Sequence, residues 1–222
     1  VIDEDFAAVS NQMLGRLFTD DQPSAIQAYP QHAPMHLVVT EESYQFSHPD
    51  YDDFVGFTFR ITNAGIKTVQ NAYIGIFADG DVGHRDTPNY WEDDASAYAA
   101  DIAVDHGAHG VQAYDFGYWY DTDGDAGQAP GYAGIVMLDH PTDPSGVAAP
   151  PTVSVVTYAS FSGSAAYEDG GDPTNDFERY ELLSSQVIEP APVIPQDHRT
   201  LIAAGPFAAI APGQSIEFSF AL

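Results

Sequence analysis

Apolar and polar residues alternate along much of the chain from Met35 onward, which is the pattern of half-buried β-strands. The clearest alternation places apolar side chains at every second position: Val55, Phe57, Phe59 and Ile61. A turn at 63–65 and a further apolar run at 72–77 then predict an antiparallel pair over 54–77. More strands are expected at 35–39, 112–120, 132–138, 152–161 and 215–222, most of them bounded by Gly, Pro or Asp clusters. The pattern predicts an all-β fold, an antiparallel β-sandwich or jelly roll with long acidic loops.

Helical spacing is confined to two short stretches. Apolar residues recur at three- and four-residue steps over Asp5–Phe18, so we expect residues 1–34 to form an N-terminal arm with a short helix. Residues 35–222 then form the β-sandwich module. A second short helix is predicted at 174–184, where Thr174 or Asn175 can cap it. The segment 189–195 (EPAPVIP) lacks enough backbone donors for a central strand and is expected to be an extended connector.

The length of 222 residues suits one sizeable core, and the charge is strongly one-sided. Asp and Glu total 33 against 6 Lys and Arg, giving a net charge of −27. Such a chain repels phosphate backbones and anionic lipid surfaces, so nucleic acid is not an expected partner. Without an apolar run of about 18 residues, no membrane insertion is expected. The acidity fits a surface adapted to a saline habitat, bound divalent cations, or both.

Two acidic turns follow directly after strong strands and are the most informative motif. The first carries Asp79 and Asp81, and the second carries Asp121, Asp123 and Asp125. A third acidic cluster, Glu92-Asp93-Asp94, lies between them in the sequence. Alternating carboxylates and glycines allow several oxygens to converge on a hard cation, and Ca²⁺ accepts six to eight oxygens in irregular geometry. The sequence therefore predicts calcium as cofactor, with these ligands: Asp79, Asp81, Asp93, Asp94, Asp121, Asp123 and Asp125.

The second turn is not an EF-hand, because its sixth position is Ala126 and its twelfth is Tyr132. The alternative is that both turns are ordinary solvated Asp-Gly turns. A zinc or other transition-metal site at Asp105, His106 and His109 is a weaker possibility, since the HExxH spacing is missing. With no GxSxG elbow and no measurable carboxylate pair, an enzyme is less expected than a non-catalytic protein. The chain has no cysteine.

Several segments together resemble a known kind of module. They are Asp52-Asp53-Phe54-Val55 leading to Ile61-Thr62-Asn63, the stretch from Tyr73 to Gly83, and the pair Gly205-Pro206-Phe207 and Ala211-Pro212-Gly213-Gln214-Ser215. They are similar to an uncharacterised β-rich module that recurs in large secreted or surface proteins of environmental bacteria, often exported by type IX-like systems. The resemblance implies an extracellular or cell-surface location and a β-rich fold.

These observations favour a non-catalytic, calcium-stabilised structural or adhesive module of a secreted bacterial surface protein or extracellular assembly. The start at Val1 and the finish within an alternating run lead us to expect a longer parent polypeptide. Partners would then be calcium and other copies of the chain or neighbouring domains. One alternative is a carbohydrate-binding module whose glycan stacks on Tyr118, Trp119 and Tyr120 in the aromatic run 114–120. Another is a secreted hydrolase using loop carboxylates.

Overall fold

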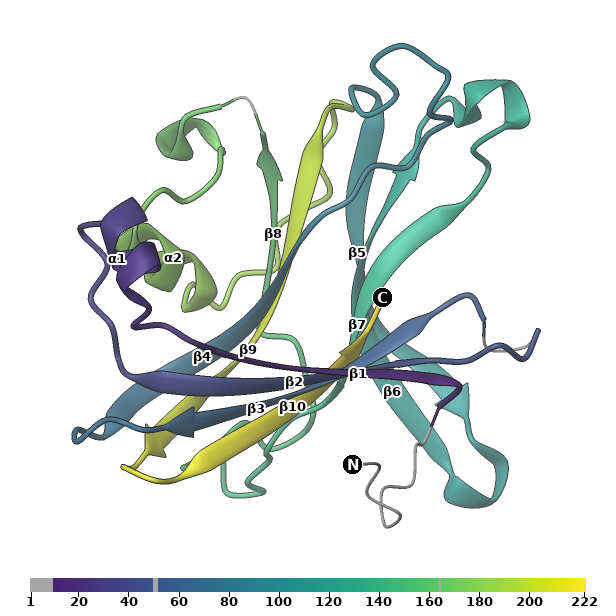
Figure 1. Ribbon diagram of the computed structural model, residues 1–222. Coiled ribbons are helices and arrows are strands. Elements are labelled where there is room, and N and C mark those ends of the chain that lie inside the picture. Colours follow the sequence, from purple (N-terminus) through teal and green to yellow (C-terminus); the bar gives the residue numbers. More distant parts are fainter. Residues whose placement is uncertain (1–9, 50–51, 164) are drawn as a thin grey trace.

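The computed structural model describes residues 10–49, 52–163 and 165–222, whose strands form two antiparallel sheets (Figure 1). The larger sheet has the order β1 (Gln12–Thr19), β2 (Leu37–Gln45), β3 (Val55–Asn63), β10 (Ser215–Ala221), β7 (Tyr132–Asp139), β6 (Val111–Asp121) and β5 (Asp94–Asp105). The smaller sheet has the order β4 (Val69–Asp79), β9 (His198–Ile210) and β8 (Thr157–Ser162). The prediction of an all-β, sandwich-like fold is confirmed.

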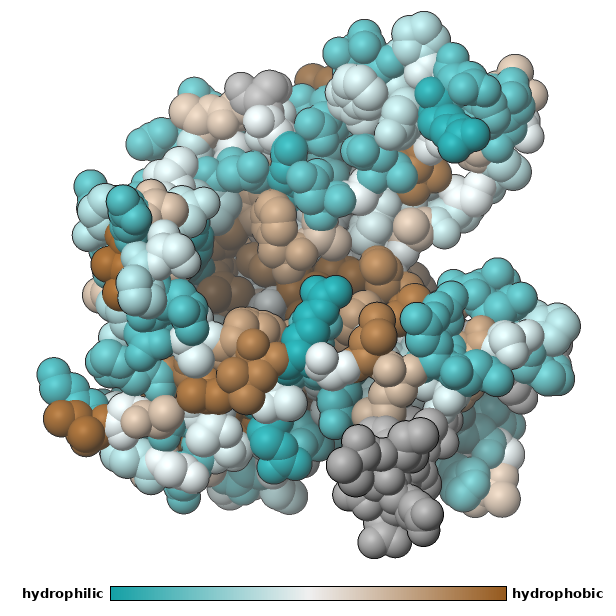
Figure 2. Space-filling view, viewed as in Figure 1, coloured by the Kyte–Doolittle hydropathy of each residue, from teal (hydrophilic) through white to brown (hydrophobic). Residues whose placement is uncertain are grey.

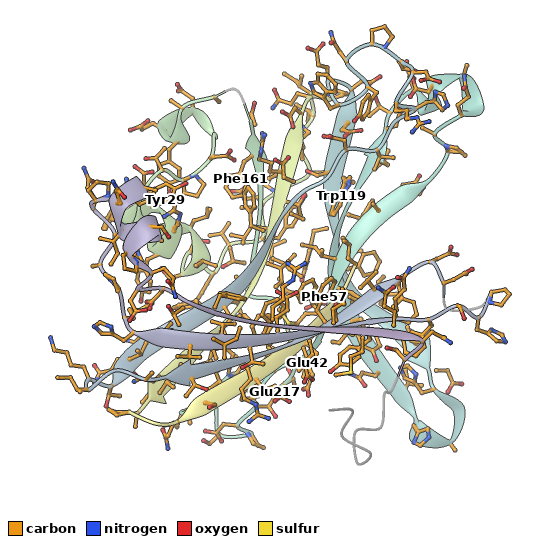
Figure 3. The ribbon with its side chains drawn as sticks, in the orientation of Figure 1. Tyr29, Glu42, Phe57, Trp119, Phe161 and Glu217 are labelled. Atoms are coloured by element: carbon orange, nitrogen blue, oxygen red, sulfur yellow. The ribbon has the colours of Figure 1, made fainter. Side chains whose placement is uncertain are left out.

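The core lies between the two sheets and is built from alternating side chains. Phe57 stacks on Phe220 with ring centroids 4.8 Å apart, and Phe59 stacks on Phe218 at 5.1 Å. The smaller sheet contributes Tyr158 and Ile202, both with no exposed surface. Figure 3 shows Phe57 in this interior, whereas Glu42 and Glu217 lie on the outer side of the larger sheet. The period of two therefore separates core from solvent, as the sequence pattern predicts.

Helices are short and lie beside the smaller sheet (Figure 1). α1 spans Pro23–Ala28, and α2 spans Asp176–Leu183. The Asn175 side chain caps α2, because its Oδ1 accepts hydrogen bonds from the backbone N–H groups of Phe177 and Glu178, each at 3.0 Å. Leu182 and Leu183 cover the outer side of this sheet at a second apolar cluster, formed by Ala159, Phe161 and Leu201. The predicted helix within 174–184 is thus confirmed.

The helix expected over Asp5–Phe18 is wrong where the structure describes it. Residues 1–9 lie outside the described residues, and Gln12–Thr19 is strand β1. Its eight residues pair in antiparallel register with β2, from Gln12 opposite Gln45 to Thr19 opposite Val38. The apolar residues at helical spacing therefore lie on both faces of an edge strand, and sheet pairing overrides the local pattern.

The antiparallel pair expected over 54–77 is also wrong. β3 belongs to the larger sheet and β4 to the smaller one, so the chain crosses between sheets after the turn at 63–65. The strand expected over 152–161 begins only at Thr157. β5 and β9 were not anticipated by the pattern of alternation. The segment 189–195 contains no strand and is a connector, as predicted.

Within the described residues, none of the helices reaches the length and apolarity required to cross a membrane.

Candidate metal centre

The predicted acidic residues gather at one end of the molecule because three strand ends meet there. β4 ends at Asp79, β5 begins at Asp94, and β6 ends at Asp121. Asp94 and Asp121 are opposite one another in the β5–β6 register. The loops 80–93 and 122–131 extend beyond these ends and lie side by side at the upper right of Figure 1.

Hydrogen bonds join the two loops. The backbone N–H of Val82 donates to Asp94 Oδ2 at 3.1 Å, and the N–H of His84 donates to Asp125 Oδ2 at 2.5 Å. Thr122 donates to the Asp93 carbonyl oxygen from its backbone N–H at 3.2 Å and from its hydroxyl at 2.7 Å. The two acidic turns thus form one structural unit, which is the arrangement that a shared cation site requires.

Three of the predicted ligands form one cluster, which we call the Asp121 cluster: Asp93, Asp121 and Asp123. Each offers a carboxylate oxygen, and these oxygens lie within 4.8 Å of one another. Ca²⁺–oxygen bonds are about 2.3–2.6 Å long, so oxygens on opposite sides of the ion are separated by roughly 5 Å. The spacing fits carboxylates that share one calcium-sized cation, with waters or backbone carbonyls completing the shell.

Within the Asp121 cluster, Asp121 itself has an oxygen that lacks a partner among the described residues. Its Oδ1 accepts hydrogen bonds from the N–H groups of Asp123, at 2.9 Å, and Gly124, at 2.7 Å. The residue is only 8% exposed, and its Oδ2 is buried without a hydrogen-bond partner in the described part of the chain. A buried, unpaired carboxylate oxygen is costly, and a bound cation would remove that cost.

The neighbouring carboxylate of Asp94 is buried even more deeply, at 1% exposure, and its Oδ1 is also unpartnered among the described residues. Burial, with a smaller contribution from the charges of Asp81 and Asp121, raises the pKa of Asp94 to about 7, although the hydrogen bond from Val82 acts in the opposite direction. Burial and the charge of Asp121 likewise raise the pKa of Asp93. Within the described part of the chain, the carboxylates of Asp93 and Asp94 therefore lack a neighbouring positive charge that would stabilise their ionised form.

A second group of carboxylates already contains a cation. Asp79 and Asp81 are joined by Asp197, which precedes β9, with oxygens again within 4.8 Å. Arg199 Nε lies 3.1 Å from Asp79 Oδ2, and its Nη1 lies 3.4 Å from Asp197 Oδ2. Burial, Asp197 and Asp79 raise the pKa of Asp81. Because a guanidinium occupies this group, it suits a metal less well than the Asp121 cluster, where the described residues form no ion pair with Lys or Arg.

The structure thus divides the seven predicted ligands. Asp93, Asp121 and Asp123 form one group, Asp79 and Asp81 belong to another, and Asp94 lies between the loops. Asp125 belongs to neither group, and its carboxylate accepts the hydrogen bond from the His84 N–H. Asp197 and Arg199 were missed because β9 was not predicted, so no sequence signal placed them near Asp79. Neither His106 nor His109 belongs to a potential metal-ligand group in the described ranges.

The aromatic run on β6 divides between the two faces of its sheet. Trp119 is 4% exposed and packs under the first acidic loop, where a Cβ at Gly80 would overlap its indole ring. It is therefore closed to a sugar. The outer-face residues are half-buried and line an open hollow of about 800 Å³ together with parts of β5 and β7. Its aromatic lining is Tyr114, Phe116, Tyr118 and Tyr132, and Tyr120 continues the row with its ring centroid 5.2 Å from that of Tyr132.

No protein-family model matches this chain, and a comparison with curated proteins found no match either.

Proposed function

We propose that this chain is a non-catalytic, calcium-stabilised structural or adhesive module of a secreted bacterial surface protein or extracellular assembly. The observation that carries the calcium part is the buried, unpartnered Asp121 Oδ2 within a group of three carboxylates. The resemblance to modules of secreted proteins supports the location. The cation would tie the end of β6 and the turn that follows it to the loop that precedes β5.

The physical effect follows from linkage between binding and folding. Without a cation, the carboxylates of the Asp121 cluster repel one another in a partly buried setting, which destabilises the folded state. A cation that binds only the folded chain stabilises it by RT ln(1 + [L]/Kd), about 2.7 kcal/mol at a hundredfold excess over Kd. For a domain of this size, that corresponds to a rise in melting temperature of about 5–11 °C.

The test compares melting temperature in chelator, in calcium, and in sodium chloride at the ionic strength of the calcium sample. Calcium should raise the melting temperature beyond the rise produced by sodium chloride alone. Asp121→Asn/Asp123→Asn should lose the calcium-specific part and keep the salt response. The matched control is Glu168→Gln/Asp169→Asn, which makes the same change in charge at an exposed turn outside the cluster and should retain both.

Asp123→Asn alone provides a second variant, because Asp123 is exposed and its replacement spares the buried Asp121 carboxylate. It should weaken calcium binding measured by calorimetry while leaving the chelated protein folded. If calorimetry detects no calcium binding at millimolar concentration, and melting follows ionic strength only, the calcium-stabilised module is rejected.

A second candidate function, glycan binding, is favoured by the aromatic outer face of β5, β6 and β7. Tyr132 is 72% exposed, and its ring centroid lies 6.0 Å from that of Tyr118. Exposed rings of this kind can stack on the apolar faces of sugars. Native gels cast with soluble polysaccharides should show retardation that Tyr132→Ala abolishes and that Tyr180→Ala, at an exposed ring on α2, preserves. Equal migration with every polysaccharide would reject this candidate.

A further inference from the structure

Strand β1 is the outer edge of the larger sheet, and its backbone leaves one row of polar groups unpaired in the described part of the chain. The N–H of Asp20 donates to the Leu37 carbonyl oxygen, so Asp20 points toward β2. Backbone direction alternates along a strand, so Phe18, Arg16 and Leu14 also turn toward β2. Gly15 and Leu17 therefore turn their N–H and C=O groups outward. In Figure 1, β1 runs along the open side of the sheet.

Apolar side chains on β1 are exposed on both faces of the sheet. Leu17 is 69% exposed on one face, and Leu14 and Phe18 are 51% and 44% exposed on the other. Figure 2 shows an apolar area at the centre of the view, where β1 and its neighbours lie in Figure 1. An edge strand that offers free backbone groups and apolar side chains on both faces is suited to accept another strand.

The other edges within the described residues are obstructed. β8 forms bridges from Tyr158 to Ile188 and from Ser162 to Gly171. β5 is interrupted by a bulge between Ala99 and Ile102, where the Asp101 N–H turns back to Asp115 Oδ1 at 2.9 Å. β4 has a bulge between Ala72 and Ile74, and the Tyr180 hydroxyl donates to the Asn71 carbonyl oxygen. Such devices prevent strand addition, and β1 carries none of them.

Charge identifies the occupant. β1 (QMLGRLFT) contains no acidic residue and carries Arg16, one of only six Lys and Arg residues in a chain with 33 acids. It is therefore a strand edge where a second copy of this strongly acidic chain can approach without placing carboxylates against carboxylates. We propose that β1 pairs antiparallel with β1 of a second copy, which joins two seven-stranded sheets into one continuous sheet. The same strand serves both copies, so the contact closes as a two-fold dimer.

This proposal goes beyond the calcium-dependent function, and it can be tested on the full chain. Sedimentation equilibrium from 10 μM to 1 mM, in chelator with about 0.15 M or 1 M sodium chloride, should show a monomer–dimer equilibrium. Association should strengthen at least tenfold at high salt, because the Debye length falls from about 8 Å to 3 Å and repulsion between two acidic copies is screened. A chain that stays monomeric at 1 mM in 1 M sodium chloride overturns the proposal.

Leu17→Pro locates the contact. It removes an outward N–H and leaves the β1–β2 bonds in place, so association should weaken at least tenfold with little change in melting temperature. Leu17→Lys should act similarly by placing an ammonium at the edge. The matched control is Ile66→Lys, which makes the same kind of change at a residue that is 93% exposed between β3 and β4 and should dimerise like the parent.

Dimerisation of Leu17→Pro and Leu17→Lys at parental strength would overturn the assignment to β1. Loss of dimerisation in Tyr132→Ala, with Leu17→Pro unchanged, would place the contact on the aromatic face instead. These experiments measure the mass of the protein in chelator, where no calcium is bound. A failure of the calcium proposal therefore does not change their expected results.

Discussion

Asn63 is the residue at which a single substitution should disturb both sheets. It ends β3 with no exposed surface, and its Nδ2 donates to the carbonyl oxygens of Lys67, at 2.8 Å, and Ile210, at 2.7 Å. Its Oδ1 accepts a hydrogen bond from the Gly65 N–H at 3.0 Å. Since β3 lies in the larger sheet and Ile210 ends β9 of the smaller one, this side chain connects the two sheets at the point where the chain crosses.

Asn63→Ala removes all three hydrogen bonds. Each contributes about 0.5–1.5 kcal/mol net, so the free energy of unfolding should fall by about 3 kcal/mol. For a domain of this size, that corresponds to a melting temperature lower by about 6–12 °C. Asn63→Asp should be worse, because it keeps the acceptor for Gly65 but directs a buried carboxylate at two carbonyl oxygens.

The assay is urea unfolding followed by tryptophan fluorescence, which reports on the buried Trp119. The control is Gln31→Ala, at an exposed amide side chain, where a change within about 0.5 kcal/mol is expected. If Asn63→Ala unfolds within 0.5 kcal/mol of the parent, the connection between the sheets does not depend on this side chain and the reasoning is wrong.

Other substitutions test the arm and the core. The hydrogen bond from His32 Nδ1 to Asp176 Oδ2, at 2.8 Å, raises the pKa of His32 above 6.5, so its stabilisation is present below pH 6.5 and is lost as pH rises through the folded-state pKa. The melting-temperature difference between the parent and His32→Gln should therefore shrink between pH 6 and pH 9, and a constant difference would contradict this. Gly117→Val should lower the free energy of unfolding by about 1–3 kcal/mol, measured in urea, because a Cβ at Gly117 would lie 2.8 Å from Thr200 Cγ2. Gly131→Val should not lower it, because a Cβ at Gly131 meets open space.

Much of the fold was predictable where one face of a strand meets the core and the other meets water. β3 and β10 satisfy this condition, since Phe57 and Phe220 point inward while Arg60 and Glu217 form a 2.7 Å ion pair on the outer side. The predicted helix at 174–184 had an equally local cause, because Asn175 supplies the cap from within the segment. Local chemistry and burial agree in these elements.

β9 and β5 escaped prediction because their environments do not produce alternation. β9 is covered on both faces, by the core and by α2, so Leu201, Ile202 and Ala203 are all buried and no period of two appears. β5 is built largely from Ala and Asp, which carry little strand preference. β1 was misread because apolar residues on both faces of an edge strand mimic helical spacing.

The candidate site was likewise predictable only in part. The sequence indicated which carboxylates sit at strand ends, and Asp93, Asp121 and Asp123 do come together. Their grouping depends on β5 and β6 being neighbours, and the pairing of Asp79 with Arg199 depends on β9. Contacts of this kind are set by the order of strands in the sheets. The spacing of residues along the chain therefore could not show that Arg199 neutralises the group of Asp79 and Asp81 and leaves the Asp121 cluster without a cation from the described residues.

The calcium site and the β1 edge should respond to different ions, because they differ in place and in charge. One Ca²⁺ adds two charges, and −27 plus 2 leaves −25, so calcium relieves repulsion within the Asp121 cluster but barely changes repulsion between copies. β1 lies apart from the acidic loops in Figure 1 and contains no carboxylate. Calcium should therefore raise the melting temperature of the parent but not that of Asp121→Asn/Asp123→Asn. Sodium chloride should raise the average mass of the parent by promoting dimerisation, but not that of Leu17→Pro. If the first variant also abolished dimerisation in chelator, the acidic end would form part of the contact, and pairing through β1 alone would be wrong.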